Sequence, residues 1–327
     1  MKCISRNRII LSVLIVILCI SLCGCGKSSL ICKYPTVELD NEFFNTSANS
    51  NIKGFADDLC VASGDVITEG MEPLSSTAAL FSLDDNKVIY ANKMFDKMYP
   101  ASITKILTAL VFFENYKGDY TETLTASSVV NINEPGAQEC GFAEGDQIPI
   151  DVVLHGLLIY SGNDAANMIA EYIGGSVDNF VTMMNDTAKR LGATGSNFVN
   201  PHGLSDDNHY TTAYDLYLIF NEVMKYDKFI ELISQKEYTG EYTKASNTTR
   251  TVKWQSTNLY FTGDKEIPEG ITVIGGKTGT TKAAGSCLIL LSQNSQGKKF
   301  ISVVMKADDK AALYSQMSQL LTLEASN

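Results

Sequence analysis

Three short polar motifs border apolar segments at widely separated places in this chain of 327 residues. They read Ser-Ile-Thr-Lys at 102–105, Ser-Gly-Asn at 161–163 and Lys-Thr-Gly at 277–279. Each supplies a different part of a serine acyl-transfer site: a nucleophile beside an amine base, a proton relay, and a cationic strand edge that holds a carboxylate. The fold must bring these three segments together, and this requirement restricts it more than any other feature.

The first motif lies at the start of a predicted helix, because apolar residues at helical spacing follow it over 103–111. Three-residue spacing places Ser102 and Lys105 one turn apart on the same side, so the amine can reach the hydroxyl. A lysine is a base near neutral pH only where burial or another cation lowers its pKa, and Lys277 is the expected second cation. The alternative is an ordinary helix start with a capping serine and a solvated lysine.

A second Ser-x-x-Lys match, at 50–53, lacks this context. It lies in a polar stretch rich in Asn and Ser, where nothing would hold the two side chains together. Chance supplies about one such match in a chain of this length. We therefore dismiss Ser50 as a nucleophile.

The second motif is predicted to join two helices, since an apolar run over 152–160 precedes it and a helical pattern over 165–173 follows. Ser161 would pass a proton to a leaving amine, and the Asn163 amide would hold Lys105 and a substrate carbonyl. Ser, Asn and Asp are also preferred helix caps, so capping of the following helix is the alternative.

The third motif stands between two predicted strands. Gly279 would let a ligand backbone lie close to the chain. An exposed strand edge with Lys277, Thr278 and Thr280 can add a substrate as one more strand and bind its carboxylate. The alternative is a hairpin turn rich in Gly and Thr.

In this order, the motifs resemble those of the penicillin-recognising serine transferases and hydrolases. Flanking residues narrow the resemblance to the serine D-Ala-D-Ala carboxypeptidases, the low-molecular-mass penicillin-binding proteins of peptidase family S11. They are Pro-Ala-Ser-Ile-Thr-Lys at 100–105, Ser-Gly-Asn-Asp-Ala-Ala at 161–166, Phe-Val-Asn-Pro-His-Gly-Leu at 198–204 and Gly-Lys-Thr-Gly-Thr-Thr at 276–281. The resemblance covers about residues 75–320.

The resemblance implies an α+β fold of the β-lactamase/DD-peptidase type. An antiparallel sheet from both chain ends would pack with helices beside an all-helical lobe, with the active site in the cleft between them. Apolar patterns agree with this arrangement. Strands are predicted at 77–83, 87–91, 285–292 and 299–306, and helices at 102–115, 150–160, 164–173, 177–191, 213–224 and 309–322.

The same resemblance implies the chemistry. Ser102 would attack the carbonyl between the two D-alanines of a peptidoglycan stem peptide, Lys105 would accept its proton, and Ser161 with Lys277 would protonate the departing D-Ala. The backbone N–H groups of Ser102 and Thr280 would form the oxyanion hole. The expected substrate-binding residues are Asn163, Lys277, Thr278, Gly279 and Thr280. Water would hydrolyse the acyl-enzyme, and a β-lactam would trap it.

No cofactor or metal is expected, because the three histidines and the cysteines match no metal-ligand spacing. The net charge of −11 argues against a nucleic-acid partner. The disulfide state of Cys32, Cys60, Cys140 and Cys287 cannot be deduced from their positions.

Two departures from the family pattern concern the carboxylate site and the anchor. No arginine follows Arg250, although some relatives place one near the substrate carboxylate, and Lys306 or Lys310 is the expected substitute. The carboxy-terminal β-rich domain and amphipathic anchor of many relatives are not present after the last predicted helix. An amino-terminal lipid is expected to replace that anchor.

Other functions remain open. A class A β-lactamase needs a glutamate about 35 residues after the second motif, and residues 195–201 contain none. A non-hydrolytic penicillin or muropeptide receptor would keep acylation without turnover. A DD-endopeptidase or transpeptidase would use the same site.

The amino terminus predicts export. Basic residues precede an apolar stretch at 9–22, as in a secretory signal peptide over 1–24. Leu-Cys-Gly-Cys at 22–25 resembles a lipoprotein box with lipidation at Cys25, and an uncleaved anchor or a secreted form is the alternative. A flexible tether is predicted over 25–70 and the catalytic domain over 71–327. The expected location is the outer face of the cell membrane, facing the cell wall.

Overall fold

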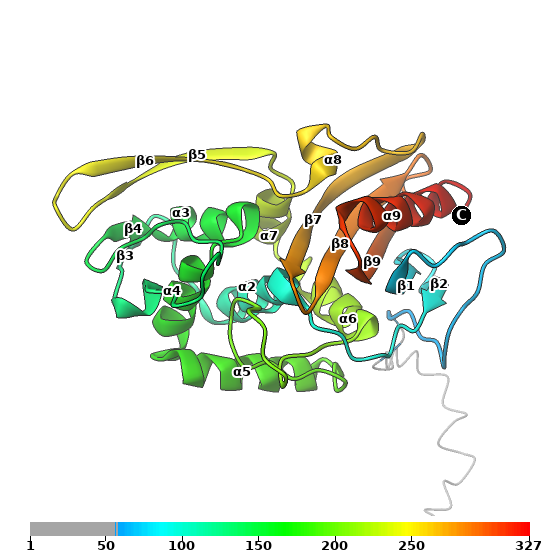
Figure 1. Cartoon of the computed structure of the whole chain (residues 1–327), viewed down its shortest axis with the longest axis horizontal. Coiled ribbons are helices and arrows are strands. Elements are labelled where there is room, and N and C mark those ends of the chain that lie inside the picture. Colours follow the sequence, from blue (N-terminus) through cyan, green and yellow to red (C-terminus); the bar gives the residue numbers. More distant parts are fainter. Residues whose placement is uncertain (1–55, 57) are drawn as a thin grey trace, which may run out of the picture. The chain divides into compact units, whose positions relative to one another are not determined.

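A five-stranded antiparallel sheet organises one lobe of the computed structural model, which describes residue 56 and residues 58–327 (Figure 1). The strand order is β2-β1-β9-β8-β7, so strands from both ends of the described chain pair at the centre. The strands are β1 (Ser75–Ser82), β2 (Lys87–Asn92), β7 (Ile271–Thr281), β8 (Gly285–Asn294) and β9 (Lys299–Ala307).

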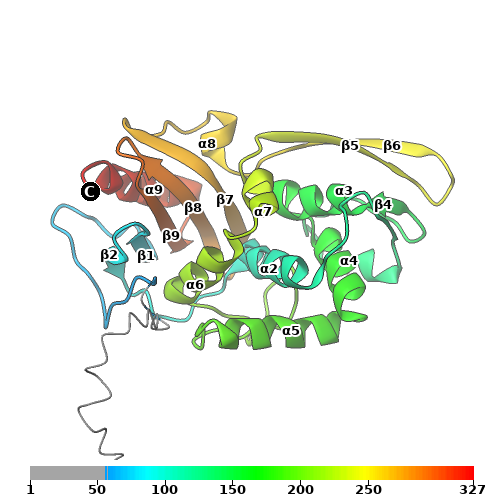
Figure 2. The same cartoon turned by 180° about the vertical axis from the view of Figure 1, so that it is seen from behind.

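Both faces of this sheet are covered, which explains why its central strands read as continuous apolar runs. Successive side chains of a strand point to opposite faces. Leu288 and Leu290 pack with the last helix, α9 (Lys310–Ala325), whereas Ile289 and Leu291 belong to the core shared with the helical lobe. Figures 1 and 2 show α9 on one face of the sheet and α6 on the other.

The helical lobe surrounds α2, whose residues 105–113 are all buried. A helix that is buried on every side belongs at the centre of its lobe. The helices between the two halves of the sheet are η2 (Ala101–Thr104), α2 (Lys105–Asn115), η3 (Ser128–Val130), α3 (Ile150–His155), η4 (Gly156–Tyr160), α4 (Asn163–Gly174), α5 (Val177–Arg190), α6 (Ala213–Val223), α7 (Asp227–Ile233) and α8 (Leu259–Thr262).

A second sheet of order β3-β4-β5-β6 lies on the helical lobe, with its long β5–β6 hairpin running beside α3 (Figure 1). The sequence did not predict it, because the two hairpin strands are mostly polar and half exposed. Its strands are β3 (Thr123–Thr125), β4 (Gln147–Pro149), β5 (Glu237–Thr243) and β6 (Thr249–Gln255).

All predicted strands and helices are present within a few residues of their expected bounds. Three details differ. The helix predicted over 102–115 begins with a 3₁₀ turn, and the one predicted over 150–160 continues as a π-helix from Gly156. The third motif lies inside β7 and not between two strands, because Gly275 and Gly276 pair with Leu291 and Leu290 of β8 and do not turn the chain.

The end of the predicted tether is wrong in the part that the structure describes. Cys60 is buried, its N–H donates to the Tyr217 hydroxyl (2.8 Å), and its carbonyl accepts from the Tyr214 hydroxyl (2.9 Å). Val66 forms a β-bridge with Ala91. Residues 58–66 therefore belong to the folded domain, although their apolar residues are too sparse to show periodicity. The predicted signal peptide, Cys25, Cys32 and tether residues 26–55 lie outside the described residues.

Cys60, Cys140 and Cys287 are buried free thiols.

Among the described residues, no helix has the length and apolar character needed to cross a bilayer.

A chain that begins at Met71, the predicted domain boundary, should unfold more easily than one that begins at Gly54. The shorter chain loses the buried Cys60 and the Val66 bridge, at a cost of roughly 2–5 kcal/mol. Urea denaturation followed by circular dichroism measures the difference. As a control, Tyr217→Phe in the longer chain should cost only about 1 kcal/mol. Equal midpoints for the two chains would show that residues 58–66 do not stabilise the domain.

Candidate active site

The three predicted motifs meet where the sheet faces the helical lobe. Ser102 lies in η2, one turn before Lys105, the first residue of α2. Lys105 Nζ is 2.9 Å from Ser102 Oγ, and Lys277 Nζ, on β7, is 2.8 Å from Ser161 Oγ. Ser102 and Ser161 line the same cavity. The fold thus brings together all three segments that the sequence singled out.

Lys105 is fully buried, and its amine has three hydrogen-bond partners. These are Ser102 Oγ at 2.9 Å, Asn163 Oδ1 at 2.7 Å and the His202 carbonyl at 2.8 Å. Burial, and then the nearby Lys277, hold the pKa of Lys105 well below its usual value. A neutral amine has two N–H bonds and one lone pair. With both N–H bonds directed to the amide and the carbonyl, the lone pair faces the hydroxyl of Ser102, as a general base requires.

The second basic group is also buried. Lys277 Nζ donates to Ser161 Oγ and to the Thr278 carbonyl. Burial lowers the pKa of Lys277 to about 7, so this amine can give up or take up a proton near neutral pH. Ser161, whose backbone lies in the left-handed region (φ 71°), bonds the Lys277 amine and also lines the small cavity beside Ser102. The pair can therefore pass a proton to a group bound beside Ser102.

The capping alternative for the second motif does not hold. Gly162 is the N-cap of α4 and makes no side-chain cap bond, and neither Ser161 nor Asn163 accepts a first-turn N–H, although Asp164 Oδ1 accepts that of Ala165. Asn163 Oδ1 is occupied by Lys105, and the Asp164 carboxylate accepts the N–H groups of Cys140, Gly141 and Phe142. Asp164 thus fixes a loop over residues 131–146, whose Gln138 carbonyl accepts the Asn163 N–H.

Glycine at two positions allows the site to close around the nucleophile. A Cβ on Gly279 would lie 2.9 Å from Ser102 N, and one on Gly203 (φ 91°) would lie 1.8 Å from the Ala101 carbonyl oxygen. Real Cβ atoms do not approach backbone so closely. Strand β7 and the loop over 198–204 therefore both contact the nucleophile turn through backbone. The sequence predicted close approach of a ligand backbone at Gly279, and the structure shows that the nucleophile turn itself lies there.

Ser102 lines two cavities. The larger, of about 800 Å³, includes Glu134, Gln138, Asn163, Thr280 and Lys282 in its wall. The smaller, of about 170 Å³, is a separate space at the edge of β7. Its lining residues are Ser102, Gln138, Ser161, Thr257, Thr278, Gly279, Thr280, Lys310, Leu313 and Tyr314.

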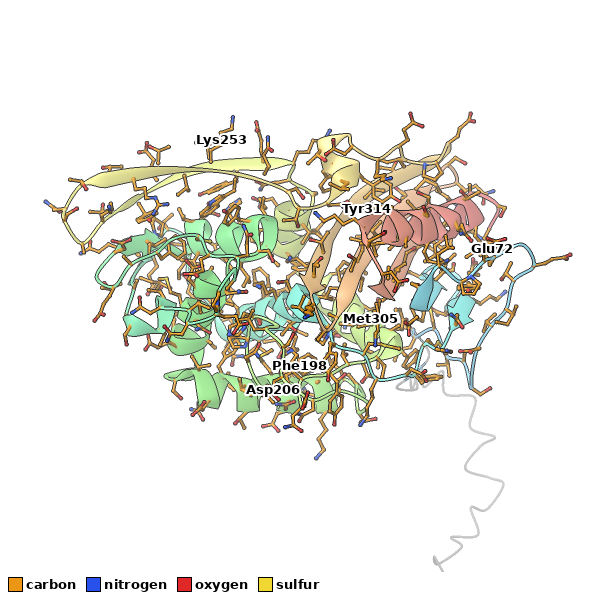
Figure 3. The ribbon with its side chains drawn as sticks, in the orientation of Figure 1. Glu72, Phe198, Asp206, Lys253, Met305 and Tyr314 are labelled. Atoms are coloured by element: carbon orange, nitrogen blue, oxygen red, sulfur yellow. The ribbon has the colours of Figure 1, made fainter. Side chains whose placement is uncertain are left out.

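The structure distinguishes between Lys306 and Lys310, the two expected substitutes for the arginine that some relatives place near the substrate carboxylate. Lys310, at the start of α9, lines the small cavity together with Thr278, Thr280 and Tyr314, the last of which is labelled in Figure 3. Lys306 lines a different cavity, beside Ser75 and Asp308. Of these two lysines, only Lys310 thus lines the cavity at the edge of β7.

Sequence reasoning missed two contributors to this site. Gln138 lines both cavities, and Asp164 holds the loop that carries it. No local pattern marks Gln138, whereas the acidic residue directly after Ser-Gly-Asn could have been read as a loop anchor. Among the described residues, no group of three His, Cys, Asp or Glu side chains could hold a metal ion.

The family model described as D-alanyl-D-alanine carboxypeptidase matches residues 67–309. The chain belongs to this family. It is 30% identical over 253 residues to the D-alanyl-D-alanine carboxypeptidase DacF of Bacillus subtilis, an alignment that covers 76% of this chain and 61% of DacF. It is 32% identical over 263 residues to a D-alanyl-D-alanine endopeptidase of Escherichia coli, with 77% of each chain covered.

Solved structures agree on the fold of this S11-family chain. The Streptomyces K15 DD-transpeptidase superposes with a TM-score of 0.73 at 23% identity, covering 80% of this chain and 100% of the transpeptidase. The predicted α+β fold of the DD-peptidase type is therefore confirmed. The chain spans about three-fifths of the length of DacF.

Lys105→Arg should slow acylation of Ser102 by a fluorescent penicillin by about 10²–10⁴-fold, because a guanidinium keeps its proton and cannot act as a base. Stopped-flow fluorescence gives the rate, and circular dichroism checks the fold. Since the pKa of Lys105 is lowered, the wild-type rate should already be near its plateau well below pH 10.5. An arginine variant that acylates at the wild-type rate would show that Lys105 is not the base.

Proposed function

We propose that this protein is a serine D-Ala-D-Ala carboxypeptidase that removes the terminal D-alanine from peptidoglycan stem peptides. The observation that carries the proposal is the placement of the Lys105 amine, from which the direction of its lone pair follows. Two fixed acceptors, Asn163 Oδ1 and the His202 carbonyl, leave it facing Ser102 Oγ. Membership of the D-alanyl-D-alanine carboxypeptidase family supports this substrate class.

In the acylation step, Ser102 Oγ forms a bond to the carbonyl carbon between the two D-alanines, and its proton goes to Lys105. The N–H groups of Ser102 and Thr280 stabilise the oxyanion. The C–N bond then breaks as the amine of the departing D-alanine takes a proton through Ser161, which Lys277 replenishes. Lys105 then gives up the proton that it took from Ser102, and Lys277 regains the one that it supplied. The neutral Lys105 accepts a proton from the water that attacks the ester and returns it to Ser102 Oγ as the C–O bond breaks, which releases the shortened peptide. A β-lactam forms the same ester, but its tethered leaving group stays in the site.

The carboxylate of the departing D-alanine fits the small cavity. Thr278 and Thr280 offer hydroxyl groups and Lys310 offers positive charge in this cavity, and the Lys277 amine lies next to it, bonded to Ser161. Edge strand β7 can pair with the peptide as an additional strand. The larger cavity, which Ser102 also lines, then receives the rest of the stem peptide.

Release of D-alanine from a pentapeptide ending in D-Ala-D-Ala tests the function. Wild-type protein and Ser50→Ala should release it, and Ser102→Ala should not. Mass spectrometry should find penicillin on the peptide that contains Ser102. Penicillin labelling without any D-alanine release would overturn the carboxypeptidase and favour a non-hydrolytic receptor. Rapid penicillin hydrolysis would favour a β-lactamase.

A DD-endopeptidase is the second candidate, because the chain covers 77% of a relative with that name. A cross-linked muropeptide dimer offered beside the free pentapeptide separates the two activities. Cleavage of the dimer at a rate equal to or above that of the pentapeptide would replace the proposed carboxypeptidase by an endopeptidase. We expect the pentapeptide to be the better substrate.

Export and anchoring are part of the proposal. A signal peptide over 1–24 and a lipid on Cys25 would place the catalytic domain on the outer face of the membrane, near its substrate. Metabolic labelling with an alkyne fatty acid should mark the full-length protein and not its Cys25→Ser variant. Equal labelling of both, or of neither, would contradict lipidation at Cys25.

Lys310→Ala should lower kcat/KM for the pentapeptide by about 10–100-fold, the value of one charge-assisted contact to a carboxylate. Lys310→Arg should keep most of the activity, since arginine also binds carboxylates. Lys306→Ala is the matched control, because this lysine lines another cavity. A fall in kcat/KM with Lys306→Ala and none with Lys310→Ala would show that Lys306, and not Lys310, binds the substrate carboxylate.

A further inference from the structure

The residue directly before the nucleophile has an unusual backbone conformation. Ala101 has φ 48°, in the left-handed region that residues with a Cβ rarely adopt. Such a conformation persists only where the surroundings hold it, and it is common at functional sites. The turn that presents Ser102 therefore needs support from outside itself.

A buried side chain gives part of that support. Thr104, inside the first motif, is fully buried, and its hydroxyl donates to the Ala101 carbonyl (2.8 Å). The same hydroxyl has a second partner, because His209 Nε2 lies 2.8 Å from Thr104 Oγ1. His209 is only 1% exposed and comes from a loop more than one hundred residues later in the chain.

The contacts of His209 fix the direction of this chain of hydrogen bonds. Its Nδ1 accepts the backbone N–H of Val199 (3.1 Å), so the proton of the neutral ring is on Nε2. Nε2–H then donates to Thr104 Oγ1, whose own hydrogen is left for the Ala101 carbonyl. Burial lowers the pKa of His209 to about 4, which keeps the ring neutral near pH 7.

The ring itself is held in place. It packs edge-on against Phe198, with the ring centroids 5.5 Å apart. The backbone N–H of His209 donates to the Asp206 carbonyl, which fixes the chain at this residue. These contacts and the Val199 N–H hold Nε2 in position beside Thr104.

We propose that His209 is a positioning residue for the nucleophile, acting through Thr104 and the Ala101 carbonyl to hold the turn that presents Ser102. The inference rests on the proposed acyl-transfer function. His209 does not touch the substrate. Its loss lets the turn relax, which moves Ser102 Oγ relative to Lys105 and to the carbonyl that it attacks.

The test separates acylation from binding in the full-length protein. Stopped-flow measurements over a range of fluorescent-penicillin concentrations give the first-order acylation constant and the dissociation constant of the preceding complex. His209→Leu should lower the acylation constant by about 10–100-fold, as a small misplacement of a reacting group does, and leave the dissociation constant within about threefold. His209→Gln should restore most of the rate, because its amide keeps an N–H donor.

Thr104→Val removes the hydroxyl between His209 and the Ala101 carbonyl and leaves the His209 ring unchanged. It should lower the acylation constant as His209→Leu does. The double variant should be no slower than the slower single variant, since both changes break one chain of contacts. His155→Leu is the matched control. This buried histidine stacks on Tyr238, away from the nucleophile turn, so its loss should reduce stability and leave the acylation constant unchanged.

An unchanged acylation constant in folded His209→Leu or in Thr104→Val would overturn the proposal. A loss that His155→Leu reproduces would also overturn it, because general destabilisation would then be the cause. If His209→Leu does not fold, Thr104→Val and His209→Gln still decide the question. Absence of acylation in the wild type would instead remove the proposed function.

Discussion

The hydrogen bonds of the buried Lys105 amine are the interaction on which the site depends. A charged amine with no exposed surface is costly, so burial favours the neutral form. The neutral form is useful only if its lone pair points at the nucleophile. Two acceptors from different parts of the chain, Asn163 at the start of α4 and His202 in a loop, fix that direction. The basicity of Lys105 is therefore a property of the packed helical lobe and not of the Ser-x-x-Lys motif alone.

The sheet contributes a second buried amine and a close backbone surface. Lys277 depresses the pKa of Lys105 further and binds Ser161, so the two lysines have different tasks although both are buried. Glycine at 279 allows β7 to approach η2, and glycine at 203 allows a helical-lobe loop to do the same. The nucleophile turn is thus held between the two lobes. We conclude that the position of Ser102 is decided by both.

The sequence predicted the elements that carry the motifs, because apolar periodicity and turn residues are local signals. It also placed Ser102 with Lys105 correctly, since three-residue spacing on a helix is a geometric fact. It could not separate a functional Ser161 or Asn163 from a helix cap, because that distinction depends on Lys105 and Lys277 in other segments. The hairpin alternative for the third motif failed for a similar reason, as pairing with β8 keeps the two preceding glycines extended.

Other features had no local signal at all. Residues 58–66 read as a tether because their few apolar residues show no periodicity, although Cys60 and Val66 each find a partner in the domain. The choice between Lys306 and Lys310 depends on where α9 begins relative to β7. The support of Ala101 by His209 joins residues that are far apart in the chain, and only the fold reveals it.

The most direct test of this account is the pKa of Lys105 in the free protein, measured by NMR on chains with ¹⁵N at the lysine side-chain nitrogen. The signal is assigned by its loss in Lys105→Arg. The account predicts that Lys105 titrates well below the ordinary lysine value of 10.5. A Lys105 amine that titrates near 10.5 would contradict it, because a protonated lysine cannot accept the proton of Ser102.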